Sequence, residues 1–257
     1  MQSVDPTIQT FADPNSLTHA AVIRFVQIAR EAIKTRDQFT VALSGGSTPK
    51  ALYALLATQP WQNQIDWNQV HLFWGDERHA PPNDPGSNFR MTQEQLLSKV
   101  TIPQENVHRI KAENVDAQAA AAEYEQELKH FFQLSDHEFP RFDLVLLGMG
   151  ANGHTASLFP GTDAVHEQSR LVVAPWVEEL NSDRITLTPS VINNAAEIIF
   201  FVTGTEKAAT LKAVLEGQYQ PDRLPAQIIR PAQGQVVWMV DQAAASALSI
   251  AVSLTSS

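Results

Sequence analysis

One stretch in the middle of the chain constrains the fold more than any other: residues 142–161, FDLVLLGMGANGHTASLFPG. Its apolar run has no polar alternation, which predicts a parallel strand buried on both faces. Three glycines within six residues then break the run. Ligands of open α/β sheets bind beyond the carboxyl ends of strands. His154 is therefore predicted to lie at a ligand site, on a loop whose glycines let backbone N–H groups approach an anion.

Further apolar runs and helical patterns alternate along the whole chain. A 3.6-residue period predicts a helix over residues 15–36, and an alanine-rich pattern predicts a scaffold helix over 113–132. The charged side chains of that second helix are expected on its outer face: Glu123, Glu125, Glu127 and Lys129. Apolar runs predict strands at residues 39–43, 70–74, 171–173, 184–187, 197–202 and 236–240, with a turn at 188–190 and a last helix over 241–250. This alternation predicts one α/β domain over residues 1–257, with a mostly parallel sheet covered on both faces.

Composition excludes several classes of function. The 257 residues are 44% hydrophobic, enough for one large core, and 18 basic against 28 acidic residues give a net charge of −10. This charge argues against nonspecific binding to nucleic acid or to an anionic membrane. The chain has no cysteine, so disulfides, thiolate nucleophiles and cysteine-based zinc sites are excluded. Residues 1–10 lack the pattern of a signal peptide and no apolar run is long enough to span a membrane, so a soluble cytoplasmic protein is expected.

A second motif, SGGSTP, occupies residues 44–49 between the strand 39–43 and a predicted helix over 50–57. A glycine turn with hydroxyls and a proline at the first helical position is the layout of an anion site at a helix N-terminus. The motif is neither a Walker loop nor the dinucleotide fingerprint. The alternative is a tight strand-to-helix turn without a ligand.

A third motif, GDER at residues 75–78, follows the strand 70–74. A proline-rich segment, 79–86, comes next and is predicted to be a loop, before residues 87–91 and a helix to about residue 100. Long loops at strand ends are often functional lids. An isolated charge triplet is often only a solvated turn. Its position at the end of a buried strand favours a site.

Lys207 belongs to a fourth motif, TGTEK at residues 203–207, after the strand 197–202. A cation in the first turn of a helix is mildly unfavourable to the helix dipole unless an anion is nearby, although a solvated lysine remains the alternative. The histidines outside the central motif show no His-x-x-x-His spacing, so no metal site is predicted.

In this order the four motifs closely resemble the 6-phosphogluconolactonase family, over about residues 10–250. The resemblance implies a three-layer α/β/α fold related to glucosamine-6-phosphate deaminase and ribose-5-phosphate isomerase. It also implies hydrolysis of 6-phospho-D-glucono-1,5-lactone to 6-phospho-D-gluconate in the oxidative pentose phosphate pathway. No metal or organic cofactor is implied, and the expected partner is the small sugar-phosphate lactone, with the protein a monomer or small homo-oligomer.

The resemblance also assigns roles to residues. His154 would activate water for attack on the lactone carbonyl, and Asp76 would orient either that histidine or the substrate hydroxyls. Arg78 and Lys207 would bind the phosphate, with Arg184 as a weaker candidate. The remaining predicted contacts to the sugar acid come from Ser44, Gly45, Gly46, Ser47, Asn88, Asn152 and Gly153. Asn152 departs from the family, which usually has aspartate there, and this removes a negative charge beside the base.

These residue types suit the chemistry, because lactone hydrolysis needs a base with a pKa near 7 and N–H donors for the developing oxyanion. A serine esterase is disfavoured, since the chain has no Gly-x-Ser-x-Gly elbow. The nearest rival is glucosamine-6-phosphate deaminase, whose loop continues Ile-Ala-Phe-Asn-Glu-Pro and whose acidic motif reads Asp-Glu-Tyr. Residues 155–160 and 76–78 here read TASLFP and DER, so the deaminase carboxylate is missing. A non-catalytic sugar-phosphate sensor is the third alternative, against which the retained His154 argues.

Overall fold

The computed structural model describes residues 7–249, and its centre is a parallel sheet of seven strands. The strand order is β1-β11-β10-β6-β2-β3-β5, and every pairing in it is parallel. The strands are β1 (Thr7–Phe11), β2 (Phe39–Leu43), β3 (Val70–Trp74), β5 (Val107–His108), β6 (Leu144–Gly148), β10 (Glu197–Val202) and β11 (Gln235–Asp241). The predicted parallel α/β sheet is confirmed. β2 is buried at every residue, as expected for a parallel strand covered on both faces.

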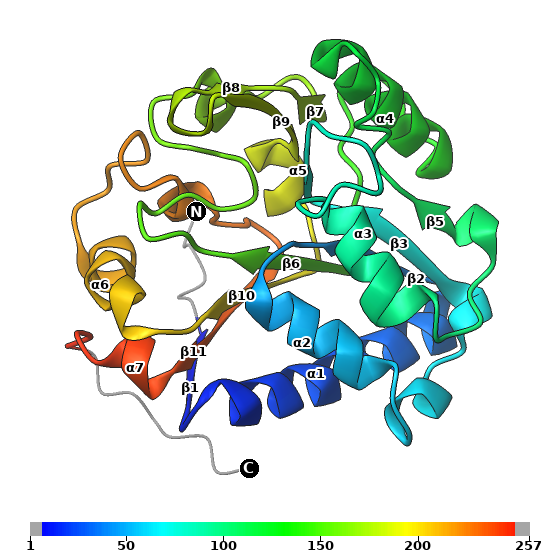
Figure 1. Cartoon of the computed structure of the whole chain (residues 1–257), viewed down its shortest axis with the longest axis horizontal. Helices are drawn as coiled ribbons and strands as arrows, with labels where there is room; N and C mark the ends of the chain where they lie inside the picture. The colour runs from blue at the N-terminus through cyan, green and yellow to red at the C-terminus, as the bar shows by residue number, and fades with distance from the viewer. Residues whose placement is uncertain (1–6, 250–257) are drawn as a thin grey trace.

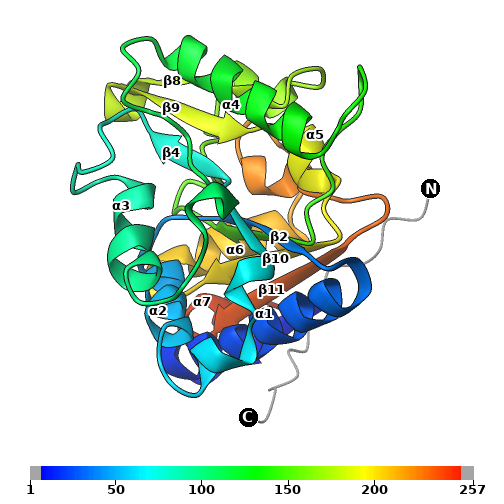
Figure 2. The ribbon, with the colours of Figure 1, turned by 90° about the vertical axis from the view of Figure 1, so that its right-hand side faces the viewer.

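Helices and a second sheet cover the two faces of this sheet. In Figures 1 and 2, α1 (Pro14–Arg36) and α2 (Ser47–Leu56) lie below the central sheet, whereas α4 (Ala117–Phe131) and α5 (Pro189–Asn193) lie above it. The other helices are α3 (Asn88–Thr92), α6 (Ala208–Glu216) and α7 (Gln242–Ala245). Asp13 caps α1 by accepting a hydrogen bond from the Ser16 backbone N–H, as expected at a helix start. Within residues 7–249, no helix is long and apolar enough to cross a membrane.

Four strands form a second, antiparallel group. Strands were predicted at residues 171–173 and 184–187, but their antiparallel pairing and the other two strands of the group were not. β4 (Asp76–Arg78) and β7 (Val172–Val173) flank β9 (Ser182–Leu187), and β8 (Trp176–Val177) also pairs with β9. The segment 76–78, for which a solvated turn was the alternative, is therefore a strand. β4, β7 and β8 have only two or three residues, which is too short to carry a period, and the residues that β4 and β7 pair with are more than ten positions away. Figure 2 shows β4, β8 and β9 above the central sheet.

Several predicted boundaries were wrong. α2 begins at Ser47, so Pro49 is its third residue and not its first. The predicted turn at 188–190 instead begins α5, and the last helix ends at Ala245, with Ile250 outside the described residues. β1 was not predicted at all. Short helical turns complete the chain: Trp61–Gln64, Trp67–Gln69, Gln104–Asn106, Asp163–His166, Glu178–Leu180, Thr205–Lys207, Pro225–Ile228 and the π-helical Gln93–Leu97.

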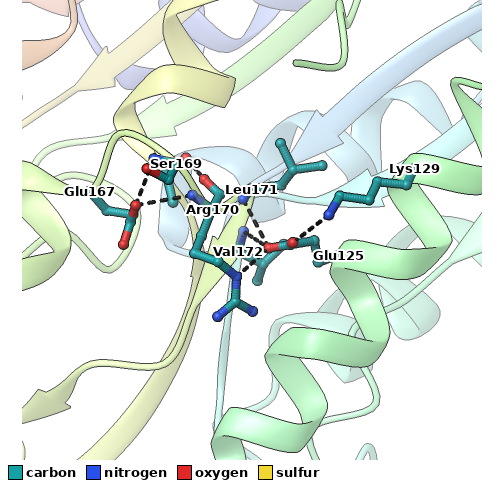
Figure 3. A network of polar contacts seen from close by, with 8 residues as sticks. Glu125, Lys129, Glu167, Ser169, Arg170, Leu171 and Val172 are labelled. Atoms are coloured by element: carbon teal, nitrogen blue, oxygen red, sulfur yellow. Dashed lines mark hydrogen bonds and ion pairs between the residues drawn. The ribbon is translucent and has the colours of Figure 1, made fainter. Parts of the chain in front are cut away.

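The expectation of a wholly charged outer face on α4 was also wrong, because Glu125 is buried. Its carboxylate accepts hydrogen bonds from Lys129 Nζ (2.8 Å), Arg170 Nε (2.8 Å) and the backbone N–H groups of Leu171 (3.0 Å) and Val172 (3.4 Å). Figure 3 shows these contacts between α4 and the chain that enters β7. Glu125 therefore ties the scaffold helix to the antiparallel group, a role that helical spacing alone does not predict.

Candidate functional site

The candidate site is a cleft of about 590 Å³ beyond the carboxyl ends of the central strands. The chain leaves β2 toward β3 on one side and leaves β6 toward β10 on the other, so the order reverses between β2 and β6. Ligands of open α/β sheets bind at such a point. The structure brings these predicted residues together in the cleft lining: Ser44, Gly45, Gly46, Ser47, Asp76, Arg78, Asn88, Asn152, His154, Arg184 and Lys207.

His154 is held by its neighbours on the loop after β6. Its Nδ1 lies 2.6 Å from Asn152 Oδ1, and its backbone N–H donates to the same oxygen (3.2 Å). Because an amide oxygen only accepts, Nδ1 carries the proton in the neutral ring and Nε2 keeps its lone pair. The ring also stacks on Phe159, with centroids 4.1 Å apart and planes inclined by 19°. The loop therefore presents one defined nitrogen as a proton acceptor.

Two glycines of this loop are required by close approaches. A Cβ built on Gly150 would lie 2.2 Å from His154 Cε1, so the imidazole occupies the space that a side chain would fill. Gly153 has φ +82°, and a Cβ there would lie 2.7 Å from Leu224 Cδ2. Gly153 does not line the cleft, and its carbonyl accepts a hydrogen bond from the Ala226 backbone N–H (2.9 Å). Gly153 therefore fixes the conformation of the loop on the side that faces away from the cleft.

The pKa of His154 is well below the value near 7 expected from the sequence. Burial, followed by the positive charges of Lys207, Arg184 and Arg78, lowers the pKa of His154 from 6.5 to about 4. The imidazole is therefore neutral at physiological pH, which is the form that accepts a proton. The sequence did not reveal this shift, because it depends on three cations that arrive from β4, β9 and the turn before α6.

Asp76 lies in the cleft but is bound to partners other than His154. Its Oδ2 accepts a hydrogen bond from Ser157 Oγ (2.7 Å), and Asn88 Nδ2 donates to its backbone carbonyl (2.9 Å). Burial raises the pKa of Asp76, while the Ser157 hydrogen bond and then the charges of Arg78 and Arg184 act in the opposite direction. Of the two orienting roles expected of Asp76, this geometry suits the substrate hydroxyls.

Arg78 and Arg184 lie directly opposite each other on the antiparallel strands β4 and β9. Like charges in opposed positions are destabilising, and the pKa of Arg184 is lowered by burial and by Arg78. With Lys207 these arginines give the cleft three cations, none of which forms an ion pair with a described residue. An anion bound there would relieve their mutual repulsion.

The loop 44–47 supplies donors on the other wall of the cleft. Its glycines lead into α2, whose first N–H groups have no partner within the helix. The Ser44 backbone is held on both sides by the Tyr53 hydroxyl, but its buried Oγ has no hydrogen-bond partner among the described residues. A buried hydroxyl without a partner is unusual in a folded protein. Its place in the cleft lining makes it a candidate ligand contact.

Among the residues that line the cleft, sequence reasoning did not single out Ser157, Phe159, Glu179 or Leu180. Ser157 and Phe159 belong to the central motif, so their positions within it were a signal that could have found them. Glu179 and Leu180 enter from the turn between β8 and β9, and no local pattern marks them. Within residues 7–249, no group of three or more histidine, aspartate or glutamate side chains is placed to hold a metal ion.

Known proteins are similar to this chain in sequence and fold over most of its length. A family model described as "Glucosamine-6-phosphate isomerases/6-phosphogluconolactonase" matches residues 12–238. The 6-phosphogluconolactonase of Nostoc sp. is 39% identical over 244 residues, which cover 95% of this chain and 99% of the relative. That of Synechocystis sp. is 38% identical over 239 residues, covering 93% and 97%.

Solved structures of known proteins have a fold similar to that of this chain. A 6-phosphogluconolactonase from Trypanosoma cruzi is 30% identical and superposes with a TM-score of 0.87, covering 96% of this chain and 98% of that one. A monomeric glucosamine-6-phosphate deaminase, 21% identical, has a TM-score of 0.78 over 94% of this chain and 99% of that one. This second likeness concerns the fold alone, and it confirms the predicted relation between the two folds.

Proposed function

The chain belongs to the glucosamine-6-phosphate isomerase and 6-phosphogluconolactonase family, and we propose that its cleft hydrolyses 6-phospho-D-glucono-1,5-lactone with His154 as general base. The single observation that carries this proposal is the hydrogen bond from His154 Nδ1 to Asn152 Oδ1 (2.6 Å). It leaves the Nε2 lone pair free in a cleft with three cations that form no ion pair with any described residue. A proton acceptor next to an anion site is what a phosphorylated lactone requires.

In the proposed reaction, His154 Nε2 removes a proton from water while the water oxygen forms a bond to the lactone C1. The negative charge collects on the former carbonyl oxygen, where N–H donors of the glycine loops are available. The tetrahedral intermediate then collapses, the bond between C1 and the ring oxygen breaks, and the imidazolium returns its proton to that oxygen. The product is the open-chain 6-phosphogluconate, and the enzyme returns to its initial protonation state.

In this proposal the three cations bind the substrate phosphate and also set the pKa of His154. Arg78, Arg184 and Lys207 bind the phosphate, and charge-assisted contacts of this kind are stronger than neutral ones. In the free enzyme the same cations hold the pKa of His154 low. A bound phosphate dianion offsets their field, so the pKa of His154 rises when substrate is present. Binding therefore strengthens the base at the moment when it is needed.

The test is a direct assay of 6-phosphogluconolactone hydrolysis, corrected for spontaneous hydrolysis. We expect multiple turnovers on the lactone and no ammonia from glucosamine 6-phosphate. Ammonia release would assign the site to the deaminase reaction instead. Stoichiometric binding of 6-phosphogluconate without turnover of the lactone would assign it to a sensor.

A further inference from the structure

One acidic side chain at the rim of the cleft has no role in the proposed reaction. Glu179 lies in the turn Glu178–Leu180 between β8 and β9, where it is exposed to solvent and lines the cleft. Its Oε2 accepts a hydrogen bond from Asn152 Nδ2 (3.3 Å). A carboxylate from the antiparallel group thus contacts the side chain that holds His154.

The two ends of the Asn152 amide make different contacts. Oδ1 accepts from the His154 ring and from its backbone N–H, while Nδ2 donates to Glu179. An amide turned by half a rotation would present Nδ2 to His154 Nδ1. That nitrogen would then have to accept, and the ring proton would move to Nε2. The orientation of one amide therefore decides which nitrogen of His154 is free for water.

We propose that Glu179 is a positioning residue, which selects the orientation of Asn152 and through it the tautomer of His154 with its proton on Nδ1. A carboxylate only accepts hydrogen bonds, so Glu179 favours the amide orientation that directs Nδ2 toward it. The His154 backbone N–H favours the same orientation from the other side (3.2 Å). Loss of Glu179 alone therefore leaves a mixture of orientations and not a complete reversal.

The expected effect of Glu179 on kcat rests on the proposed function, whereas its expected effect on the tautomer of His154 does not. We expect Glu179→Ala to lower kcat on 6-phosphogluconolactone by up to about 10-fold, the range expected for the loss of one ordinary hydrogen bond, with KM nearly unchanged. Glu179→Gln keeps an accepting oxygen and should retain most of the activity. Glu178→Ala is the matched control, because Glu178 Oε2 accepts from Trp176 Nε1 (2.9 Å) and not from Asn152.

A double-mutant cycle distinguishes an effect of Glu179 that acts through the Asn152 amide from one that acts through packing of the turn. Once Asn152→Ala has removed the amide, adding Glu179→Ala should change kcat no further. Additive losses in the double variant would overturn the proposal. So would equal losses in Glu178→Ala and Glu179→Ala, because both would then report only on the shape of the turn.

Nitrogen-15 NMR of the imidazole supplies a measurement that needs no substrate. At neutral pH we expect wild-type protein and Glu178→Ala to show His154 protonated on Nδ1, and Glu179→Ala to show a mixture of tautomers. Identical tautomers in all three proteins would overturn the positioning role. A wild-type protein that shows the expected tautomers but hydrolyses no lactone would overturn the proposed function and leave the role of Glu179 standing.

Discussion

The cluster around Glu125 and the wall of the cleft both assemble charges from distant parts of the chain, and they treat those charges in opposite ways. Glu125 is buried and accepts four hydrogen bonds, two of them from cations. Arg78, Arg184 and Lys207 gather around a cavity without an ion pair among the described residues. The first arrangement is complete in the protein alone, whereas the second is completed by an anion.

The same contrast appears between neighbours in β4. Glu77 is buried, and its carboxylate accepts from the Ser87 hydroxyl and from the backbone N–H groups of Arg78, Asn88 and Phe89. It thereby fixes the start of α3. Asp76, one residue earlier, lines the cleft. Adjacent carboxylates on a strand point to opposite sides, so one serves the scaffold and the other the site.

The largest expected effect is the loss of the base. His154→Gln keeps approximate size and polarity but does not accept a proton at neutral pH, so enzymatic hydrolysis should fall by about 10²–10⁴-fold. Binding of 6-phosphogluconate and the melting temperature should persist, because the cations lie on other segments. His19, exposed on α1, provides the control variant His19→Gln. A folded His154→Gln protein with more than about a tenth of normal turnover would contradict the assignment.

Removal of a cation should weaken use of the phosphorylated lactone specifically. We expect Arg78→Ala, Arg184→Ala and Lys207→Ala each to lower kcat/KM for 6-phosphogluconolactone by about 10–100-fold, the value of a charge-assisted contact. Unphosphorylated gluconolactone is the internal control and should be affected far less. Equal losses on both substrates would mean that these cations support the structure, as Glu125 does.

Glu125 should show the reverse pattern, with stability lost and chemistry kept. Glu125→Ala leaves the buried N–H groups of Leu171 and Val172 without this acceptor, and we expect the free energy of unfolding to fall by about 1–3 kcal/mol. Glu123→Ala, on the exposed side of α4, should change it by less than about 0.5 kcal/mol. Denaturant titration measures both. If Glu125→Ala leaves stability unchanged, or lowers turnover per folded molecule, then Glu125 does not play the purely structural role that distinguishes it from the cations of the cleft.

The pH dependence of that stability has a definite sign. Burial raises the pKa of Glu125, but the hydrogen bonds from Lys129 and Arg170 outweigh it and leave that pKa below the ordinary 4.5. The ionised carboxylate therefore stabilises the folded protein above pH 4.5, and this contribution is lost as the pH falls through the lowered pKa. The difference in stability between wild type and Glu125→Ala should shrink in the same window.

The smallest expected effect concerns Asn152. Asn152→Asp places a carboxylate beside His154 Nδ1, which favours the imidazolium and raises the pKa of His154 above its value of about 4. Because the neutral ring is the active form, the rising limb of the kcat/KM profile should move to higher pH by about one unit. An unmoved limb would show that residue 152 does not act on the base electrostatically.

The sequence alone determined five of the seven strands of the central sheet, all but β1 and β5, and the motifs that form much of the cleft. Mostly apolar runs such as 39–43 and 197–202 are signals of buried parallel strands, and four glycine or charged motifs follow such strands directly. Because parallel strands direct their carboxyl ends to one edge, the motifs had to converge. His154, Asp76 and the loop 44–47 were found for this reason.

Only the tertiary structure decided which charges are paired and how the base is tuned. Glu125 and Glu77 look like solvated charges in the sequence, and their burial depends on partners that come from other elements. The pairing of Arg78 with Arg184 across short strands, the lowered pKa of His154 and the approach of Glu179 to Asn152 are likewise contacts between distant segments. Local periodicity reports the faces of single elements, whereas desolvation and Coulomb interactions depend on distances between elements, which folding alone establishes.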